Sequence, residues 1–171
     1  MITIRHEASE DIPAIHALNE LAFDQSLEAN IVDKIRNSSG IGISLVAHEE
    51  GRIVGHILFS PAVIEGPRGS ITGMGLAPMA VLPGLQRQGI GTQLVKRGIE
   101  ELSASGCPFI IVLGHADYYP RFGFGRASSY GIRCPWDGVP DEAFMVLWLD
   151  RSKAGAFPGI ARYRDEFNEA I

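Results

Sequence analysis

Hydrophobic positions along the chain recur with a helical period in some regions and with a strand period in others. Two helices are predicted near the N-terminus, over residues 11–23 and 27–37, with Ser9 as the N-cap of the first. The longest helical pattern covers residues 89–105 and ends at Gly106, a residue type favoured just after a helix C-terminus. The buried stripe of the first helix is predicted to consist of Ile12, Ile15, Leu18, Ala22 and Phe23.

Strand patterns fill most of the chain outside these helices. Two glycine-containing turns, at residues 50–52 and 66–69, are typical of hairpins between consecutive strands. A short helix is predicted around residues 117–122. The predicted strands are residues 3–5, 44–48, 53–64, 75–82, 109–113, a short strand near Ile132, and residues 143–149 and 159–163. A central strand–helix–strand unit flanked by hairpins predicts an α/β domain with a mixed sheet.

Composition fits one globular domain. The 171 residues are 46% hydrophobic and 20% charged and contain no low-complexity linker, so we expect a single domain over residues 1–171. The net charge of −5 supplies no broad basic surface, and nucleic-acid binding is therefore not expected. The longest apolar runs fall far short of the roughly 20 residues that a membrane span needs, and no signal peptide is visible. These features favour a cytoplasmic protein without a membrane partner.

Metal-binding patterns are missing from the sequence. Cys107 and Cys134 form no CxxC pair, and the five histidines show neither HxxxH nor HExxH spacing. The sequence therefore predicts neither a metal site nor a disulfide framework.

The stretch from Met79 to Thr92 carries the strongest functional signal. A strand there runs into a glycine-bearing turn that opens a helix, which aims backbone N–H groups and the positive end of the helix dipole at one point. Such a point suits a diphosphate. Gly89 and Gly91 would let phosphate oxygens approach the backbone, and the Thr92 hydroxyl could add a donor. Gln86 or Arg87 could brace the turn or contact a phosphate.

The spacing of these glycines excludes two other phosphate-binding loops. A Walker A loop requires a lysine that is missing after Gly89, and a dinucleotide fingerprint requires a glycine where Leu94 stands. Neither is supported. It stays open whether Gly89 and Gly91 only pack a helix against a strand.

Two segments carry a family resemblance. Gln86-Arg87-Gln88-Gly89-Ile90-Gly91 resembles the Q/R-x-x-G-x-G/A signature of the GNAT superfamily of N-acyltransferases, and it follows a strand that ends in Val-x-Pro. Tyr119-Pro120-Arg121-Phe122-Gly123-Phe124 resembles the Tyr-x-x-x-Gly-Phe segment of the same family. The similarity extends over about residues 3–124 and is greatest to the bacterial YhbS-like branch. It implies a GNAT-like α/β (α+β) fold, with a mixed, mostly antiparallel sheet flanked by helices.

The resemblance also implies an activity. GNAT enzymes transfer an acetyl group from acetyl-CoA, a co-substrate, to a primary amine of a small molecule or protein. By the family match, the backbone of residues 79–81 would pair with the pantetheine arm, and one N–H would hold the thioester carbonyl oxygen. The residues that match cofactor-binding positions are Met79, Ala80, Val81, Gln86, Arg87, Gln88, Gly89, Ile90, Gly91 and Thr92.

The same match assigns a catalytic role to Tyr119, which stands where the family protonates or hydrogen-bonds the leaving sulfur. An aromatic ring that only packs beside Phe122 and Phe124 is the alternative. No general base is assigned, because for each candidate near the expected acceptor cleft the interpretation as a solvated surface group is favoured. These candidates are Asp24, Glu28, Glu65, His115 and Asp117.

Two classes of function therefore remain. One is an acetyl-CoA-dependent N-acetyltransferase. The other is a catalytically silent acyl-CoA-binding sensor or interaction domain, which the missing base and the short segment at residues 112–119 motivate. Family members often form homodimers through their C-terminal strands, so a homodimer is one alternative for this protein. The negative net charge slightly favours a cationic acceptor.

Overall fold

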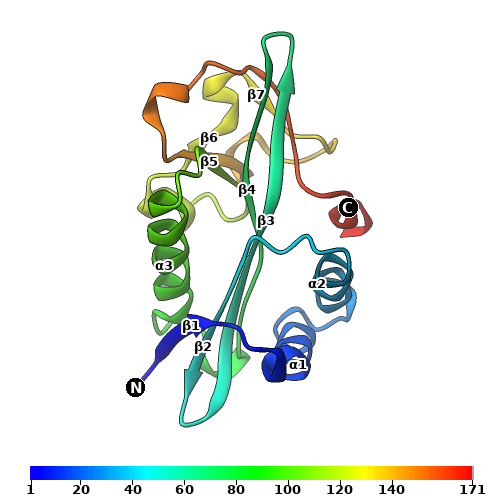
Figure 1. Ribbon diagram of the computed structural model, residues 1–171, viewed down its shortest axis with the longest axis vertical. Helices are drawn as coiled ribbons and strands as arrows, with labels where there is room; N and C mark the ends of the chain where they lie inside the picture. Colours follow the sequence, from blue (N-terminus) through cyan, green and yellow to red (C-terminus); the bar gives the residue numbers. More distant parts are fainter. Residues whose placement is uncertain (171) are drawn as a thin grey trace. The chain divides into compact units, whose positions relative to one another are not determined.

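The computed structural model describes residues 1–170, and these residues form two compact units. Unit 1 consists of Met1–Ser60, Ala77–Glu101 and the residues from Asp165 onward, and unit 2 consists of Pro61–Leu76 and Leu102–Arg164. The strands follow the order β1-β2-β3-β4-β5-β8-β6, with β9 paired to β3 and β7 paired to β9. Two long strands, β3 (Arg52–Gly66) and β4 (Gly69–Val81), contribute residues to both units without a break (Figure 1).

Unit 1 is built on antiparallel strands with helices on both faces. Strand β2 pairs with β1 on one side and with β3 on the other. Along β3, Gly55 and Phe59 face α3, whereas His56 faces α1, as the alternation of side chains along a strand requires. Figure 1 shows α3 on the opposite side of these strands from α1 and α2. The remaining elements of unit 1 are β1 (Thr3–His6), α1 (Ile12–Phe23), α2 (Leu27–Asn37), β2 (Ile43–Glu49), most of α3 (Ile90–Ala104) and the 3₁₀ segment Asp165–Ala170.

The predicted N-cap of the first helix is wrong. Ser9 lies inside a 3₁₀ turn, Ser9–Asp11, that precedes α1. Asp11 organises this turn instead, because its carboxylate accepts the Ala8 N–H at 2.7 Å and two Arg5 N–H groups at 2.6 and 3.0 Å. The Arg5 hydrogen bond is the main reason that the pKa of Asp11 lies below its ordinary value.

The last residues of the described chain return to α2. Phe167 is buried in unit 1, and Glu169 accepts from the Lys34 ammonium group at 2.7 Å. The Ser38 hydroxyl donates to Glu166 at 3.0 Å. Unit 1 is therefore assembled from segments at both ends of the sequence.

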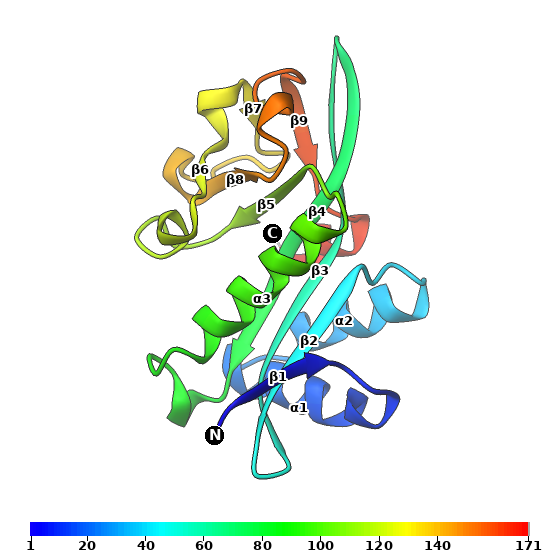
Figure 2. The ribbon, with the colours of Figure 1, turned by 60° about the vertical axis from the view of Figure 1, so that its left-hand side comes forward.

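Unit 2 is a mixed arrangement of strands (Figure 2). Strand β5 (Phe109–Leu113) pairs in parallel with β4 and antiparallel with β8 (Phe144–Trp148), and β8 also pairs with β6 (Gly125–Arg126). On the far side, β9 (Gly159–Arg162) pairs antiparallel with β3 and parallel with β7 (Ile132–Arg133).

Most predicted elements are confirmed, including the fold class of a mixed, mostly antiparallel sheet flanked by helices. Three differ. Strand β4 begins at Gly69 rather than at residue 75, the short β6 was not predicted, and the short helix is the 3₁₀ turn Tyr119–Phe122. Among residues 1–170, none of the helices has both the length and the apolar character that crossing a bilayer would require.

Candidate functional site

The predicted cofactor-binding residues form one continuous stretch of unit 1. Met79, Ala80 and Val81 end strand β4, and a 3₁₀ turn at Pro83–Leu85 leads to the first turn of α3. The chain leaves β4 in a fixed direction, because the Leu82 N–H donates to the Val54 carbonyl oxygen of β3 at 3.0 Å.

The loop before α3 is open at its glycine. Gly89 has a φ of +89°, and a Cβ built there would meet no atom within 4 Å. Arg87 also has a positive φ, of +62°, which is unusual for a residue with a side chain. If this glycine were needed for close packing, a Cβ built at its position would meet a neighbouring atom. Gly89 therefore serves the backbone conformation and leaves space beside it, which contradicts the packing reading for this residue.

A side chain of the signature braces this loop. The Gln86 amide nitrogen donates to the Val81 carbonyl oxygen at 3.2 Å, and this bond ties the loop to the end of β4. Gln86 therefore braces the turn through its side chain. Arg87 and Gln88 are exposed, so their side chains remain accessible from solvent.

The start of α3 supplies donors to the open space. The Gln93 N–H bonds to the Gly89 carbonyl oxygen at 3.1 Å, which begins the helical ladder. The N–H groups of Ile90 and Gly91 lie in the first turn, whose donors have no acceptor within the helix itself. Thr92 follows in the same turn. Together with the positive end of the helix dipole, this geometry suits an anion such as a phosphate.

Tyr119 lies in unit 2 within a cluster of aromatic rings. The centroid of its ring is 5.1 Å from that of Tyr118 and 5.7 Å from that of Phe124. A Cβ at Gly114 would come within 2.4 Å of the Tyr119 ring, so that glycine makes room for it. Burial raises the pKa of the phenol well above its ordinary value. The ring therefore packs among aromatic side chains, as the alternative for Tyr119 predicts, and its hydroxyl is neutral.

The candidates for a general base divide between the two units. Asp24 and Glu28 belong to unit 1, where Glu28 accepts from the Gln25 amide at 2.8 Å. Glu65, His115 and Asp117 belong to unit 2 and are exposed. None of these contacts singles out one of them as a base.

Two features of the structure were not predicted from the sequence. The Tyr163 hydroxyl contacts strands β4 and β5 in unit 2, and His56 lies in a buried polar network in unit 1. Tyr163 stands at the end of a predicted strand, but no spacing along the chain reveals which carbonyl its hydroxyl meets. Across the described part of the chain, no group of three or more His, Cys, Asp or Glu side chains is arranged to hold a metal ion.

The chain is similar to characterised folds and named relatives over most of its length. Residues 3–127 match the family model of the acetyltransferase (GNAT) domain. The chain is 34% identical over 166 residues to the uncharacterized N-acetyltransferase YhbS of Escherichia coli K12, covering 96% of this chain and 98% of the relative. It is 40% identical over 154 residues to the uncharacterized N-acetyltransferase YjhQ of the same strain, covering 88% and 82%.

Two solved structures of GNAT acetyltransferases are also similar to this chain. The crystal structure of YhbS from Escherichia coli in complex with CoA superposes with a TM-score of 0.90 at 33% identity, over 98% of this chain and 92% of that one. A GNAT family acetyltransferase from Brucella melitensis in complex with acetyl-CoA gives a TM-score of 0.78 at 31% identity, over 98% of both chains. With the signature loop in the open form described above, these similarities confirm the predicted resemblance, and the chain belongs to the GNAT family of acetyltransferases.

Proposed function

We propose that this protein transfers an acetyl group from acetyl-CoA to a primary amine of a small molecule or protein. The observation that carries the proposal is the open loop at Gly89, which stands at the N-terminus of α3 with free space where a side chain would lie. The related structures from Escherichia coli and Brucella melitensis, in complex with CoA and acetyl-CoA respectively, support the same ligand here.

The loop would bind the diphosphate of the cofactor. The N–H groups of Ile90 and Gly91 supply donors, and Gly89 lets phosphate oxygens approach the backbone. The exposed Arg87 adds a positive charge beside the same turn. The backbone of residues 79–81 would pair with the pantetheine arm, which carries the thioester toward the acceptor.

Transfer itself needs few groups from the protein. The nitrogen lone pair of the neutral amine attacks the thioester carbonyl carbon, and a backbone N–H of residues 79–81 would stabilise the oxyanion that forms. The intermediate collapses as the carbon–sulfur bond breaks, the sulfur leaves as a thiolate, and the proton that the amine nitrogen loses passes to water. Holding both reactants in place supplies much of the remaining acceleration.

Tyr119 is the proposed donor to the leaving sulfur. A phenol is protonated at neutral pH, and burial raises its pKa further, so the hydroxyl has a hydrogen to donate as negative charge develops on the sulfur. Its ring is fixed by the surrounding aromatic side chains, so the direction of the hydroxyl is fixed as well.

Calorimetric titration with acetyl-CoA tests the cofactor site. Gly89→Glu should weaken binding by about 100-fold or more, because two negative charges about 4 Å apart near a protein surface repel by about 4 kcal/mol. Gly155→Glu is the matched control, since Gly155 is also exposed, has a φ of +75° and has no atom within 4 Å of a built Cβ. Equal affinities in the two variants would contradict the site.

A thiol-release assay over a panel of amines tests the reaction. Release of CoA that depends on an amine is the expected result for the wild-type protein. Tight acetyl-CoA binding with no turnover on polyamines, amino acids, aminoglycosides or peptides would instead favour the catalytically silent acyl-CoA-binding domain.

A further inference from the structure

The parallel ladder between β4 and β5 in unit 2 is short. It covers Met74↔Ile110 to Leu76↔Val112, whereas β4 itself continues to Val81. Two residues beyond Leu76 stands Pro78, which has no N–H and cannot extend a ladder as a donor. The proposed cofactor-binding backbone of residues 79–81 follows directly along the chain.

Tyr163 holds the last rung of this ladder. Its hydroxyl donates to the Leu76 carbonyl oxygen at 3.0 Å, and the Ile111 carbonyl oxygen lies 3.3 Å away. The side chain is 7% exposed, so these bonds form away from water. One hydroxyl therefore joins both strands at the place where their pairing stops.

The Tyr163 ring is clamped from two sides. A Cβ at Gly75 would lie 2.5 Å from ring atoms Cδ1 and Cε1, so the ring fits only because residue 75 is glycine. The Trp136 ring is stacked with it, with centroids 5.8 Å apart and an interplanar angle of 21°. A glycine within a strand often marks such a close approach. The hydroxyl cannot leave the ladder without moving this whole arrangement.

We infer that Tyr163 is a positioning residue for the cofactor site, which fixes the end of the β4–β5 ladder so that β4 leaves the pairing at Leu76 with a defined backbone course toward residues 79–81. This inference rests on the proposed function. A buried carbonyl group that loses its donor is costly, and a strand end with an unsatisfied carbonyl adjusts its backbone to find another partner. A ligand that pairs with that backbone binds best when the backbone is already in place.

Tyr163→Phe tests the inference, because it removes the hydroxyl and keeps the ring. We expect acetyl-CoA to bind about 10-fold more weakly by calorimetric titration, equivalent to about 1.4 kcal/mol. The KM for acetyl-CoA should rise by a similar factor, with kcat at saturating acetyl-CoA within about twofold of the wild-type value. Tyr130→Phe is the matched control: it makes the same change in unit 2, at a tyrosine whose ring packs against Trp148.

Hydrogen exchange of the ligand-free protein supplies a readout that does not depend on cofactor binding. In Tyr163→Phe, the amides of residues 76–81 should exchange faster than in the wild type, while those of α1 and α2 keep their protection. A residue with only a general structural role would lower the melting temperature and leave the acetyl-CoA affinity unchanged. Unchanged affinity or unchanged exchange at residues 76–81 would overturn the inference.

Gly75→Ala changes the same contact from the β4 side, and it tests the inference if Tyr163→Phe fails to fold. Its added methyl group crowds the Tyr163 ring, so it should also weaken acetyl-CoA binding and speed exchange at residues 76–81. Wild-type protein that binds no acetyl-CoA at millimolar concentration would overturn the proposed function, and the inference with it. Wild-type binding with unaltered affinity in the folded variants would overturn the inference alone.

Discussion

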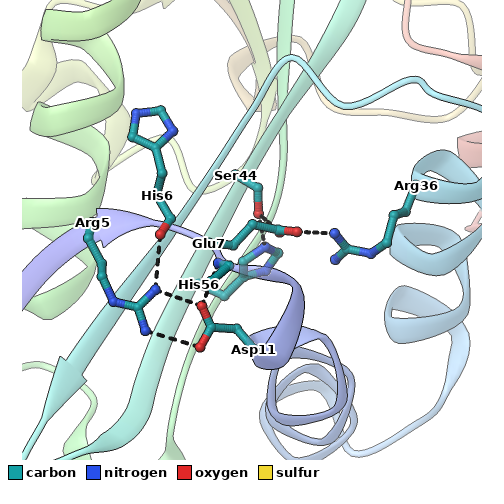
Figure 3. A network of polar contacts seen from close by, with 8 residues as sticks. Arg5, His6, Glu7, Asp11, Arg36, Ser44 and His56 are labelled. Carbon is teal, nitrogen blue, oxygen red and sulfur yellow. Dashed lines mark hydrogen bonds and ion pairs between the residues drawn. The ribbon is translucent and has the colours of Figure 1, made fainter.

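His56 is a histidine enclosed in unit 1, and Figure 3 shows it in a network with Ser44, Glu7 and Arg36. A polar group lies at each of its ring nitrogens. Its Nε2 lies 2.9 Å from the Ser44 hydroxyl, and its Nδ1 lies 3.2 Å from the Asn19 amide nitrogen. The Ser44 hydroxyl in turn donates to Glu7, which forms an ion pair with Arg36. The network joins β2, β3 and the residue that follows β1 to helices α1 and α2.

The contacts of Asn19 fix the tautomer of His56. The Asn19 amide nitrogen also donates to the Ile15 carbonyl oxygen at 3.0 Å, so its second hydrogen points to Nδ1 of the histidine. Nδ1 is then an acceptor, and Nε2 carries the hydrogen that it donates to Ser44. The ring is neutral in this arrangement, and a second proton on Nδ1 would face a donor.

Acid should therefore destabilise the protein through His56. Burial, with a smaller effect of the Arg36 charge, lowers the pKa of His56 to about 3, whereas an unfolded histidine has a pKa near 6.5. Between these values the unfolded chain binds one more proton, so the free energy of unfolding falls by about 1.4 kcal/mol per pH unit as the pH drops below about 6.5. Urea denaturation at several pH values measures this slope.

His56→Gln should flatten that slope, even though the variant is less stable at neutral pH. His48→Gln, at a half-buried position on β2, is the control and should keep the wild-type slope. Equal slopes in wild type and His56→Gln would show that another group governs acid stability.

Tyr119→Phe isolates the hydroxyl in the aromatic cluster of unit 2. We expect kcat to fall about 100-fold, since the leaving sulfur loses its donor, while the affinity for acetyl-CoA stays within about twofold. Steady-state kinetics and calorimetric titration measure the two effects. Tyr118→Phe, at the neighbouring position, should have little effect on kcat. A Tyr119→Phe enzyme with wild-type kcat would leave packing as the only role of this ring.

Residues of the signature were predictable from sequence because their backbone conformation is local. Gly89 needs a positive φ whatever surrounds it, and the order of strand, turn and helix is visible along the chain. The buried network of Asn19 and His56 was not predictable, because the sequence does not show which partners a buried polar residue will bond to. Tyr163 was missed for the same reason: its hydroxyl bonds form with strands about 50 and 90 residues earlier.

At the scale of elements, α3 packs on β3 through a glycine. A Cβ at Gly98 would lie 2.3 Å from the Phe59 ring, which is fully buried. Helix propensity alone would predict that Gly98→Ala stabilises the protein by up to about 1 kcal/mol. The contact predicts the opposite, a net destabilisation of about 1–2 kcal/mol. The free-energy cost of the steric overlap is larger than the gain in helix propensity.

Thermal or urea unfolding distinguishes these outcomes for Gly98→Ala. Ser103→Ala, at an exposed position of the same helix, should follow propensity and leave stability unchanged or slightly increased. A stabilised Gly98→Ala protein would mean that the Phe59 ring relaxes away from the helix.

Element boundaries were predictable where the apolar pattern was strong. Helix α2 and strand β5 begin and end at the predicted residues, because four buried apolar residues define α2 and a continuous apolar run defines β5. The first half of β4 contains glycine, serine and threonine, which are weak strand signals, and it was placed six residues late. The turn that precedes α1 depends on a hydrogen bond from Arg5 to Asp11. The preference for serine at helix N-caps, which led to the prediction of Ser9, does not include such a bond.

For the whole molecule, the net charge of −5 should influence the encounter with the acceptor. A negative surface raises the local concentration of cationic ligands, and salt screens this effect over about 10 Å at 0.1 M. We therefore expect kcat/KM for a positively charged amine to fall as ionic strength rises, in a thiol-release assay at two salt concentrations. A neutral amine is the control and should show little change. A salt-independent preference for an anionic acceptor would contradict this expectation.

The way the chain closes unit 1 bears on its biosynthesis. Phe167 and Glu169 pack with residues made more than a hundred positions earlier, among them Lys34, and unit 2 is translated in between. A ribosome adds about 5–20 residues per second, so α2 is synthesised several seconds before the C-terminal segment that packs on it. During that interval the part of α2 that Phe167 and its neighbours cover in the folded protein is available to chaperones, and a ribosome that stalls before residue 165 would leave it uncovered.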